Sequence, residues 1–352
     1  MHAEAEGPVE QLGARVLMTL RAATGDGGLE LARPLERISG GYWAKTYGLV
    51  LRDAPVPFRH DLILRVMPDE DLARREIAIQ RAVAGQGFPC PAVRLADASS
   101  GSIGAPFMIM DRAPGRPLLS DLSFGRAVKM LPKLLTRMPE LFAQTLAGLH
   151  ELDPEPARRA LAEAGVLAEV EGAAPLLRRL RSSAAYERVP GFDGIVEWLD
   201  EHEPHDGRRV ICHGDFHPLN VLAVGFDVEA VIDWTGGRIA NPAYDVGFTA
   251  VLLGQAPVAV PRPVRPAVAA VGRLLARRFK AEYRKRVDVD SDAVTWYEVL
   301  QSARISAEVA SWRLGGEITN ASHPFETIAA GVGAHLAGIT GTTIDMPTRR
   351  ST

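Results

Sequence analysis

The sequence predicts an α+β protein with two lobes, a small β-rich front lobe and a larger, mainly helical lobe. Short apolar runs broken by glycine and proline dominate up to about residue 112, which is typical of strands joined by turns. Helical periodicity dominates after Pro117. A chain of 352 residues is long enough for two lobes that share a cleft.

The composition indicates a globular protein that binds neither nucleic acid nor a membrane surface. Hydrophobic residues make up 47% and charged residues 24% of the chain, and the net charge is −3. This balance creates no field that would attract nucleic acid or a membrane surface. The acidic N-terminus does not resemble a signal peptide, and Cys90 and Cys212 lack disulfide or metal-site spacing. We therefore expect a cytoplasmic protein, and its oligomeric state stays open.

The predicted front lobe covers residues 1–112, and residues 113–118 form a hinge. Residues 119–345 form the helical lobe and 346–352 a tail. A long helix is expected at 135–150, and strands return between 210 and 233. The front elements are predicted as a helix at 9–23, strands at 35–39, 46–51 and 62–67, a helix at 70–84 and a strand at 106–110.

The densest chemical signal lies in the run from His213 to Leu222, which is followed by Val231-Ile232-Asp233-Trp234. Residues 220–224 and 228–232 read as two strands of a hairpin that turns at 225–227. This hairpin would place Asn220 opposite Asp233. An amide and a carboxylate oxygen suit Mg²⁺, and Asp215 beside them could accept a hydroxyl proton or orient a nucleophile.

These spacings resemble a known family. Asn220 follows Asp215 by five residues, as in the His-x-Asp-x4-Asn loop of protein kinases, whose metal-binding aspartate occupies a position similar to that of Asp233. Glycine between His213 and Asp215 is similar to the aminoglycoside phosphotransferase and choline kinase branch. The resemblance covers about residues 35–255. It implies a bilobal protein-kinase-like fold and a magnesium-dependent kinase that uses ATP or GTP on a small-molecule hydroxyl.

Within that resemblance, Asp215 is the catalytic base, and Asn220 and Asp233 hold the metal. Asp245, in the segment Asn241-Pro242-Ala243-Tyr244-Asp245, buttresses the catalytic loop. His213 is expected to brace the same loop, and His150, at the end of the 135–150 helix, could support the loop or simply cap that helix. His217 fits contact with substrate and loop packing equally well.

The front lobe offers residues for a nucleotide. Glu76 lies on an apolar face of the 70–84 helix and needs a cation, which Arg65 on the 62–67 strand could supply. The pair resembles the strand-to-helix ion pair of kinases, with Arg65 in place of the usual lysine. By resemblance, Gly40, Gly41 and Tyr42 would cover the phosphates, and Met110, Asp111 and Ala113 would line the purine site.

Several other interpretations stay open. The three polar residues of the hairpin region could be ordinary turn residues, and the Arg65–Glu76 pair could be purely structural. Gly214-Asp215-Phe216-His217 also fits a fragment of two-metal phosphoesterases, whose other ligand clusters are missing here. A zinc pair from His213 and His217 would need a helix, which Gly214 and Pro218 oppose. A catalytically silent nucleotide-binding module is the remaining alternative.

The sequence does not identify the phosphate acceptor. Residues 151–210 carry an excess of acidic groups and residues 255–352 an excess of basic groups. A polycationic aminoglycoside would favour a strongly acidic pocket, which these opposed balances do not supply. Macrolides, amino alcohols, hydroxy acids and sugars therefore all stay open.

Overall fold

The chain folds into two compact units, each of which gathers segments that are distant in the sequence. The computed structural model describes residues 9–38, 44–120, 124–205, 207–255, 262–315 and 323–348. Unit 1 comprises residues 1–116, 155–167 and 222–235. Unit 2 comprises residues 117–154, 168–221 and 236–352.

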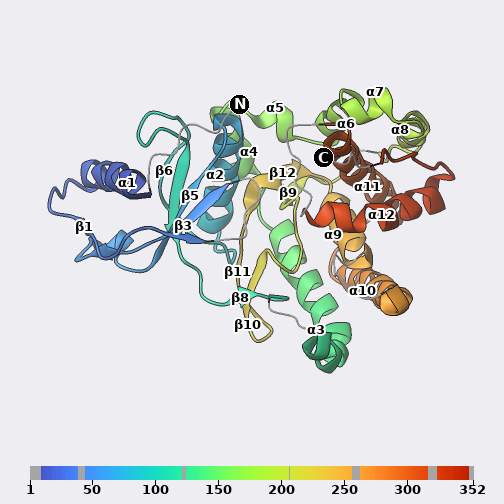
Figure 1. Cartoon of the computed structure of the whole chain (residues 1–352), viewed down its shortest axis with the longest axis horizontal. Helices are drawn as coiled ribbons and strands as arrows, with labels where there is room; N and C mark the ends of the chain where they lie inside the picture. Colours follow the sequence, from blue (N-terminus) through green and yellow to red (C-terminus); the bar gives the residue numbers. More distant parts are fainter. Residues whose placement is uncertain are drawn as a thin grey trace. The chain divides into compact units, whose positions relative to one another are not determined.

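Unit 1 is built on a five-stranded sheet with the order β2-β3-β5-β7-β6, in which every neighbouring pair is antiparallel (Figure 1). Thr46 pairs with Arg65, and Arg65 pairs with Met108, so Arg65 occupies the central strand. The strands are β2 (Glu36–Ile38), β3 (Lys45–Leu49), β5 (Leu62–Val66), β6 (Val93–Asp97) and β7 (Phe107–Asp111).

Apolar side chains cover both faces of this sheet. In β7, Phe107 and Ile109 point to a core shared with helix α1 (Val9–Thr24), whereas Met108 and Met110 point to a core shared with helix α2 (Glu70–Gly85). This alternation follows from the two-residue period of a strand. The Asp69 carboxylate accepts the Leu72 amide at 2.8 Å and caps α2. The sheet therefore fixes α2, and with it Glu76, against β5.

The other segments of unit 1 lie outside the five-stranded sheet, and several of them follow it in the sequence. The amide of Val231 donates to the carbonyl of Pro89 at 2.8 Å and ties the hairpin to the front segment. Helix α4 packs on α2. These elements are β1 (Glu30–Leu31), which pairs with β4 (Leu51–Arg52), the 3-10 turn η1 (Val56–Phe58), α4 (Glu155–Glu163) and the sheet β11-β10-β8, with β8 at Arg116–Pro117, β10 at Val221–Val224 and β11 at Asp227–Val231.

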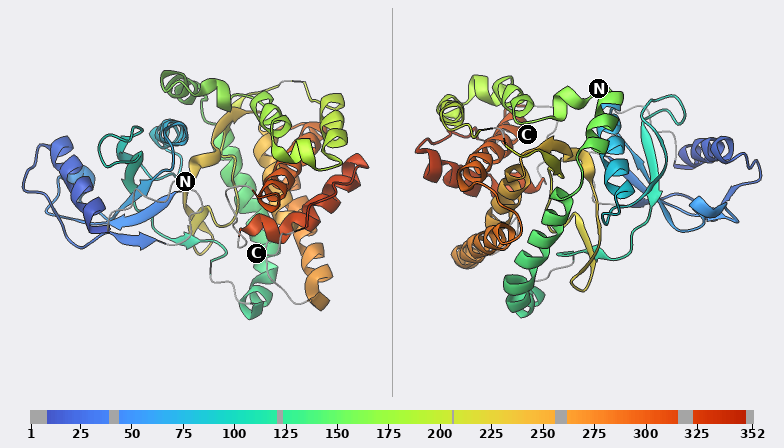
Figure 2. Two further views of the ribbon diagram at one scale, coloured as in Figure 1. Left: turned by 45° about the horizontal axis from the view of Figure 1, so that its top comes forward. Right: turned by 180° about the vertical axis from the view of Figure 1, so that it is seen from behind.

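Unit 2 is mainly helical, and its long C-terminal helices pack together (Figure 2). Phe248, Ile305 and Val332 meet in a core shared by α9, α11 and α12. The helices are α3 (Phe124–His150), α5 (Leu167–Val170), α6 (Ala174–Arg181), α7 (Ala184–Arg188), α8 (Phe192–Glu201), α9 (Ala243–Gln255), α10 (Arg265–Arg284), α11 (Ser291–Arg313) and α12 (Pro324–Thr340), with 3-10 turns η2 (Trp234–Gly236, which begins in unit 1) and η3 (Arg262–Val264) and an antiparallel pair of β9 (Val210–Cys212) and β12 (Arg238–Ala240).

The predicted α+β class is confirmed, because an antiparallel sheet near the N-terminus precedes a mainly helical remainder. The helices predicted at 9–23 and 70–84 match α1 and α2 closely. The helix predicted at 135–150 begins earlier, at Phe124, despite Pro132 and Pro139. The hinge predicted at 113–118 and the other lobe boundaries stay predictions.

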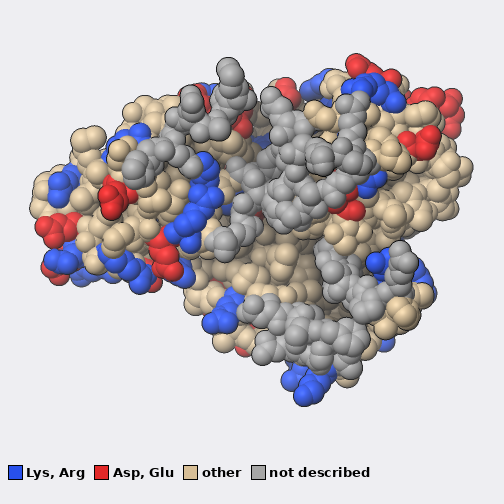
Figure 3. Space-filling view, in the orientation of Figure 1, with Lys and Arg blue, Asp and Glu red and all other residues tan. Residues whose placement is uncertain are grey.

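The surface agrees with the balanced composition. Figure 3 shows both basic and acidic side chains on the described parts of one face of the protein. Within the described part of the chain, none of the helices combines the length and hydrophobicity that crossing a membrane requires.

The approach of α9 to α11 depends on a glycine. A Cβ built on Gly247 would lie 2.9 Å from the amide nitrogen of Glu298 and 3.0 Å from the carbonyl carbon of Tyr297. We expect Gly247→Ala to lower the free energy of unfolding by about 1–3 kcal/mol, because backbone atoms cannot move aside cheaply. Gly333→Ala in α12, where a Cβ meets nothing within 4 Å, is the matched control.

Urea denaturation followed by circular dichroism measures both variants. Gly333→Ala should be neutral or stabilise the protein by up to about 1 kcal/mol, since alanine favours helix over glycine. Equal stability of the two variants would show that the α9–α11 contact is not as tight as the structure indicates.

Candidate active site

The loop from His213 to Asn220, called the catalytic loop from here on, is held by one buried carboxylate. Asp245 accepts the amide of His213 on Oδ2 and the amide of Gly214 on Oδ1, both at 2.7 Å. The Asp245 side chain has no solvent exposure, so these charge-assisted hydrogen bonds replace its lost hydration. The predicted buttressing contact between Asp245 and the catalytic loop is present, whereas its importance for activity stays a prediction.

Gly214 is required by the backbone geometry of the loop. Its φ of 78° lies in the left-handed region, which glycine adopts without strain. A Cβ at this position would lie 2.1 Å from the carbonyl oxygen of Gly236, and a Cβ on Gly236 would lie 2.7 Å from the carbonyl carbon of Gly214. Two backbone segments therefore touch directly, which explains why glycine follows His213.

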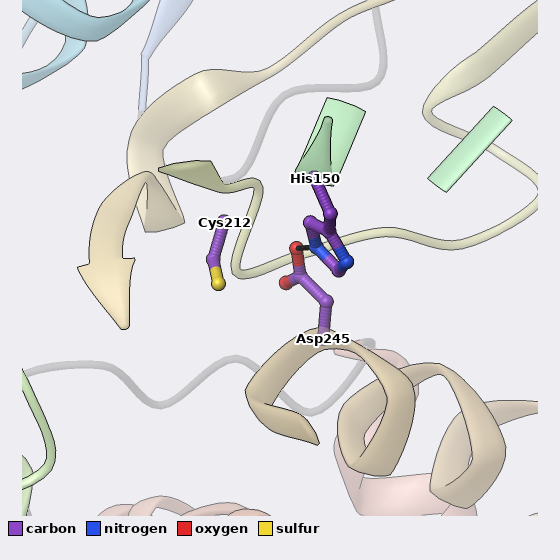
Figure 4. Close-up of side chains that lie close together, drawn as sticks. All are labelled: His150, Cys212 and Asp245. Atoms are coloured by element: carbon purple, nitrogen blue, oxygen red, sulfur yellow. Dashed lines mark hydrogen bonds and ion pairs between the residues drawn. The ribbon is translucent and has the colours of Figure 1, made fainter. Parts of the chain in front are cut away.

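A second layer of buried side chains supports Asp245 from the other side. The Nε2 atom of His150 lies 3.2 Å from Asp245 Oδ2, and its Nδ1 atom lies 2.5 Å from the Tyr283 hydroxyl. Figure 4 shows His150, Cys212 and Asp245 converging, with their ligand atoms within 4.8 Å of one another. Burial raises the pKa of the Cys212 thiol, which favours its neutral form.

This cluster is better explained as support than as a metal centre. Both oxygens of Asp245 accept amide protons, and both ring nitrogens of His150 face polar partners. Cys212 faces the carbonyl oxygens of Ala240 and Asn241 at 3.8 and 3.6 Å. A cation would have to displace these interactions. His150 therefore supports the catalytic loop instead of merely capping α3.

Asp215 lies at the tip of the clamped loop, half-buried. Its amide donates to His213 Nδ1 at 3.2 Å, so His213 braces the loop from within. The Asn220 amide nitrogen donates to the Asp215 carbonyl and to Asp215 Oδ2, both at 2.9 Å. Since the nitrogen of Asn220 is committed to Asp215, its amide oxygen is the atom that could ligate a cation.

His217 also belongs to this loop. Its Nε2 atom lies 3.4 Å from Asp215 Oδ2, and its Nδ1 atom accepts the Leu219 amide at 3.2 Å. The contact with the loop backbone indicates a packing role for His217, and a contact with substrate stays a prediction.

Unit 1 contains the second group of predicted site residues. Arg65 Nε lies 2.9 Å from Glu76 Oε1, and Arg65 Nη2 donates to Asp233 Oδ1 at 2.8 Å. The predicted pair of Arg65 and Glu76 is therefore present, and Asp233 joins it. Thr235, which sequence reasoning missed, donates its hydroxyl to the same Asp233 oxygen at 2.8 Å. Asp233 has a φ of 64°, a conformation that aspartate tolerates better than most residues.

Glu76 is the least compensated charged group of the three. It is fully buried, and its Oε2 atom has no hydrogen-bond donor among the described residues. Burial raises the pKa of Glu76 from 4.5 to about 7, although the Arg65 guanidinium opposes the shift and the Asp233 carboxylate adds to it. The Arg65 guanidinium is thus shared between the carboxylates of Glu76 and Asp233.

The predicted purine wall lies at the end of β7. Met110 is buried, and its sulfur lies 3.1 Å from Gln80 Nε2. The Asp111 amide donates to the Ala92 carbonyl at 3.1 Å, so that amide is already used within the sheet. Ala113 follows β7. The contacts of Met110, Asp111 and Ala113 with a nucleotide stay predictions, and Gly40, Gly41 and Tyr42 lie outside the described residues.

A comparison with protein families decides the assignment. The model of the phosphotransferase enzyme family matches residues 34–288, well over half of the chain. The chain belongs to this family. Solved structures support the fold: a Ralstonia eutropha protein assigned to the aminoglycoside phosphotransferases superposes with a TM-score of 0.65 at 19% identity, covering 93% of this chain and 95% of that one. The predicted kinase-like fold is confirmed.

Another structural neighbour is a thermostable mutant of aminoglycoside phosphotransferase APH(4)-Ia in a ternary complex with AMP-PNP and hygromycin B. Its TM-score is 0.53 at 18% identity, covering 93% of this chain and 98% of the other.

Curated relatives match only part of this phosphotransferase family member. Mouse acyl-CoA dehydrogenase family member 10 is 25% identical over 207 residues, which cover 58% of this chain and 19% of the relative. Viomycin phosphotransferase of Streptomyces vinaceus is 29% identical over 187 residues, covering 50% of this chain and 61% of the relative. The match to the mouse protein thus spans about a fifth of that protein's length.

The shifted pKa of Glu76 predicts a pH dependence of stability in the protein without Mg²⁺. Between pH 4.5 and about 7, the folded protein keeps a proton that the unfolded chain has lost. The free energy of unfolding should therefore fall as the pH rises through this window. Glu76 contributes a slope of up to about 1.4 kcal/mol per pH unit, and Glu76→Gln should lack this contribution.

Urea unfolding of both proteins at several pH values between 4.5 and 8 measures the difference. The gap between Glu76→Gln and wild type should widen with pH up to about 7 and then stay constant. A gap that does not change with pH would contradict a buried, shifted carboxylate.

Proposed function

We propose that this chain transfers the γ-phosphoryl group of ATP, or of GTP, to a hydroxyl group of a small molecule. The observation that carries the proposal is the Asp215 carboxylate, presented by a loop whose first two amides are clamped by Asp245. Catalysis of phosphoryl transfer consists mostly of positioning and electrostatic stabilisation, and a loop fixed in this way provides positioning. Membership of the phosphotransferase enzyme family supports the reaction class.

Asp215 acts on the acceptor. In the proposed step, the acceptor hydroxyl gives its proton to the Asp215 carboxylate, and its oxygen forms a bond to the γ-phosphorus. The bond between that phosphorus and the β,γ-bridging oxygen breaks, and the nucleoside diphosphate leaves with the electron pair. The Asn220 amide, at 2.9 Å from Asp215 Oδ2, restricts the carboxylate to one orientation. His213 and Asp245 act on the loop backbone and are positioning residues.

The residues present fit a magnesium ion by their chemistry. Asn220 would offer its amide oxygen, since its nitrogen donates to Asp215, and Asp233 would offer a carboxylate oxygen. When bound, Mg²⁺ neutralises charge on the phosphate oxygens. Thr235 and Arg65 both donate to Oδ1 of Asp233, which fixes the orientation of that carboxylate.

Arg65 is proposed to hold nucleotide phosphate, with Glu76 as its anchor. Arginine can bind phosphate through two nitrogens, and the 2.9 Å pair with Glu76 fixes its position on β5. Gly40, Gly41 and Tyr42 are proposed to cover the phosphates, and Met110, Asp111 and Ala113 to border the purine. The complex of APH(4)-Ia with AMP-PNP supports nucleotide binding by this fold.

Replacement of the proposed base tests the function. Asp215→Asn keeps the shape and the hydrogen bond from Asn220 but cannot accept a proton. We expect acceptor-dependent release of nucleoside diphosphate to fall by about a hundredfold or more, with the KM for nucleotide nearly unchanged. Asp227→Asn, at the exposed start of β11, is the matched control and should behave like wild type. Full activity of Asp215→Asn would refute the assignment of the base.

Replacement of the proposed metal ligand tests the cofactor. Asp233→Asn removes the negative charge that Mg²⁺ requires, so the Mg²⁺ concentration for half-maximal turnover should rise on the order of tenfold or more. Isothermal titration of the Mg²⁺–nucleotide complex should show weaker binding, whereas circular dichroism should show an unchanged fold. If turnover and binding keep their Mg²⁺ dependence, Asp233 is not a metal ligand.

A further inference from the structure

Thr249 makes a hydrogen bond that differs from those of other threonines in the helices. A helical threonine can donate its hydroxyl to the carbonyl four residues earlier, within its own helix. Among the described residues this bond is formed by Thr19, Thr24, Thr136, Thr145, Thr295 and Thr340. Thr249 of α9 instead donates to the carbonyl oxygen of Phe216 at 2.9 Å. Its hydroxyl therefore holds the catalytic loop.

Helix α9 holds this loop on both sides of Asp215. Asp245 and Thr249 are four residues apart, a spacing that places them on one face of the helix. Both side chains have no solvent exposure. Asp245 accepts the first two amides of the loop, and Thr249 donates to the carbonyl of Phe216. The two contacts therefore bracket Asp215 in the sequence of the loop.

The carbonyl of Phe216 depends on the Thr249 hydroxyl. The Phe216 side chain is fully buried, and its ring packs on Phe142 of α3 at a centroid distance of 5.1 Å. The hydrogen bond to its carbonyl is buried as well, and a buried carbonyl without a donor is costly. Loss of the hydroxyl would leave this oxygen unsatisfied or turn the peptide between residues 216 and 217 towards another donor.

The other backbone contacts of Asp215 come from within the loop. Its amide donates to His213 Nδ1 at 3.2 Å, and its carbonyl accepts the Asn220 side-chain nitrogen at 2.9 Å. Both partners belong to the loop and move with it, whereas the α9 contacts tie the loop to a helix outside it. That helix is fixed in turn by its close approach to α11 at Gly247. The position of the loop in the protein is thus set from α9.

We propose that Thr249 is a positioning residue for phosphoryl transfer. Together with Asp245, it determines where the Asp215 carboxylate lies relative to the acceptor hydroxyl. This inference rests on the proposed kinase function of Asp215. A small misplacement of a reacting group lowers the rate steeply. Loss of the contact with Phe216 therefore slows the chemical step and leaves the binding of nucleotide unchanged.

Two variants of Thr249 separate its hydrogen bond from its packing. Thr249→Val keeps the size of the side chain and removes the hydroxyl, whereas Thr249→Ser keeps the hydroxyl and removes the methyl group. Hydrolysis of Mg²⁺–ATP, with water in place of the acceptor, gives kcat and KM, and Asp215→Asn gives the background rate. We expect kcat of Thr249→Val to fall by about tenfold at an unchanged KM, and kcat of Thr249→Ser to stay within about twofold of wild type.

Thr145→Val on α3 is the matched control. The Thr145 hydroxyl donates at 2.8 Å to the Leu141 carbonyl in its own helix, so its removal should leave kcat unchanged. Melting temperatures are measured for every variant by circular dichroism. Thr249→Ser loses a buried methyl group and should melt at a lower temperature than wild type while it keeps its rate, a combination that a packing role does not produce.

Hydrogen exchange followed by mass spectrometry measures the loop without turnover. In Thr249→Val, the peptide that carries residues 213–220 should exchange about fivefold faster than in wild type, while peptides from α11 keep their exchange rates, because only the loop opens locally. Thr249→Ser should exchange like wild type in both regions.

The outcomes separate the inference from the proposed function. An unchanged kcat or an unchanged loop exchange in Thr249→Val overturns the inference, and hydrolysis that still depends on Asp215 then leaves the kinase function standing. A lower kcat in Thr249→Ser than in Thr249→Val, or faster exchange in the loop and α11 alike, assigns Thr249 to packing and also overturns the inference. Wild type without hydrolysis that Asp215→Asn reduces overturns both the proposed function and the inference.

Discussion

The proposed active site depends on one buried negative charge, the carboxylate of Asp245. A charge without solvent exposure is costly unless hydrogen bonds compensate it. Here the compensating donors are the amides of His213 and Gly214, each at 2.7 Å, together with His150 at 3.2 Å. The loop cannot change its backbone conformation without leaving that charge unpaired. The left-handed conformation of Gly214 and its contact with Gly236 follow from this requirement.

The arginine at the strand position where kinases commonly have lysine has a physical explanation in the contacts of unit 1. Arg65 engages Glu76 through Nε and Asp233 through Nη2. A lysine has a single nitrogen and would have to divide it between the two acids, whereas a guanidinium offers separate donors in a fixed plane. The burial of Glu76 nevertheless raises its pKa by more than the ion pair with Arg65 lowers it. The buried group therefore relieves its surplus of negative charge by keeping a proton on Glu76 up to about pH 7.

Much of the fold and the catalytic loop could be predicted from the sequence because the deciding signals are local. The apolar face of the helix with Glu76 implied a cationic partner, and the structure supplies Arg65 from the neighbouring strand. Thr235 and Tyr283 could not be predicted in the same way. Thr235 reaches Asp233 only through a left-handed turn, and Tyr283 meets His150 across 133 residues of sequence. Neither contact leaves a periodic or motif signal.

The identity of the phosphate acceptor was the least predictable feature, because the sequence gives only the net charge of whole segments. Segment totals mix exposed residues with the few that face a site, so the basic excess after residue 255 gave no information on selectivity. Solved relatives below 25% identity share the fold, and a shared fold does not determine which acceptor a site binds. Selectivity for the acceptor is therefore set by the individual side chains that line the site, which neither the motif nor the family specifies.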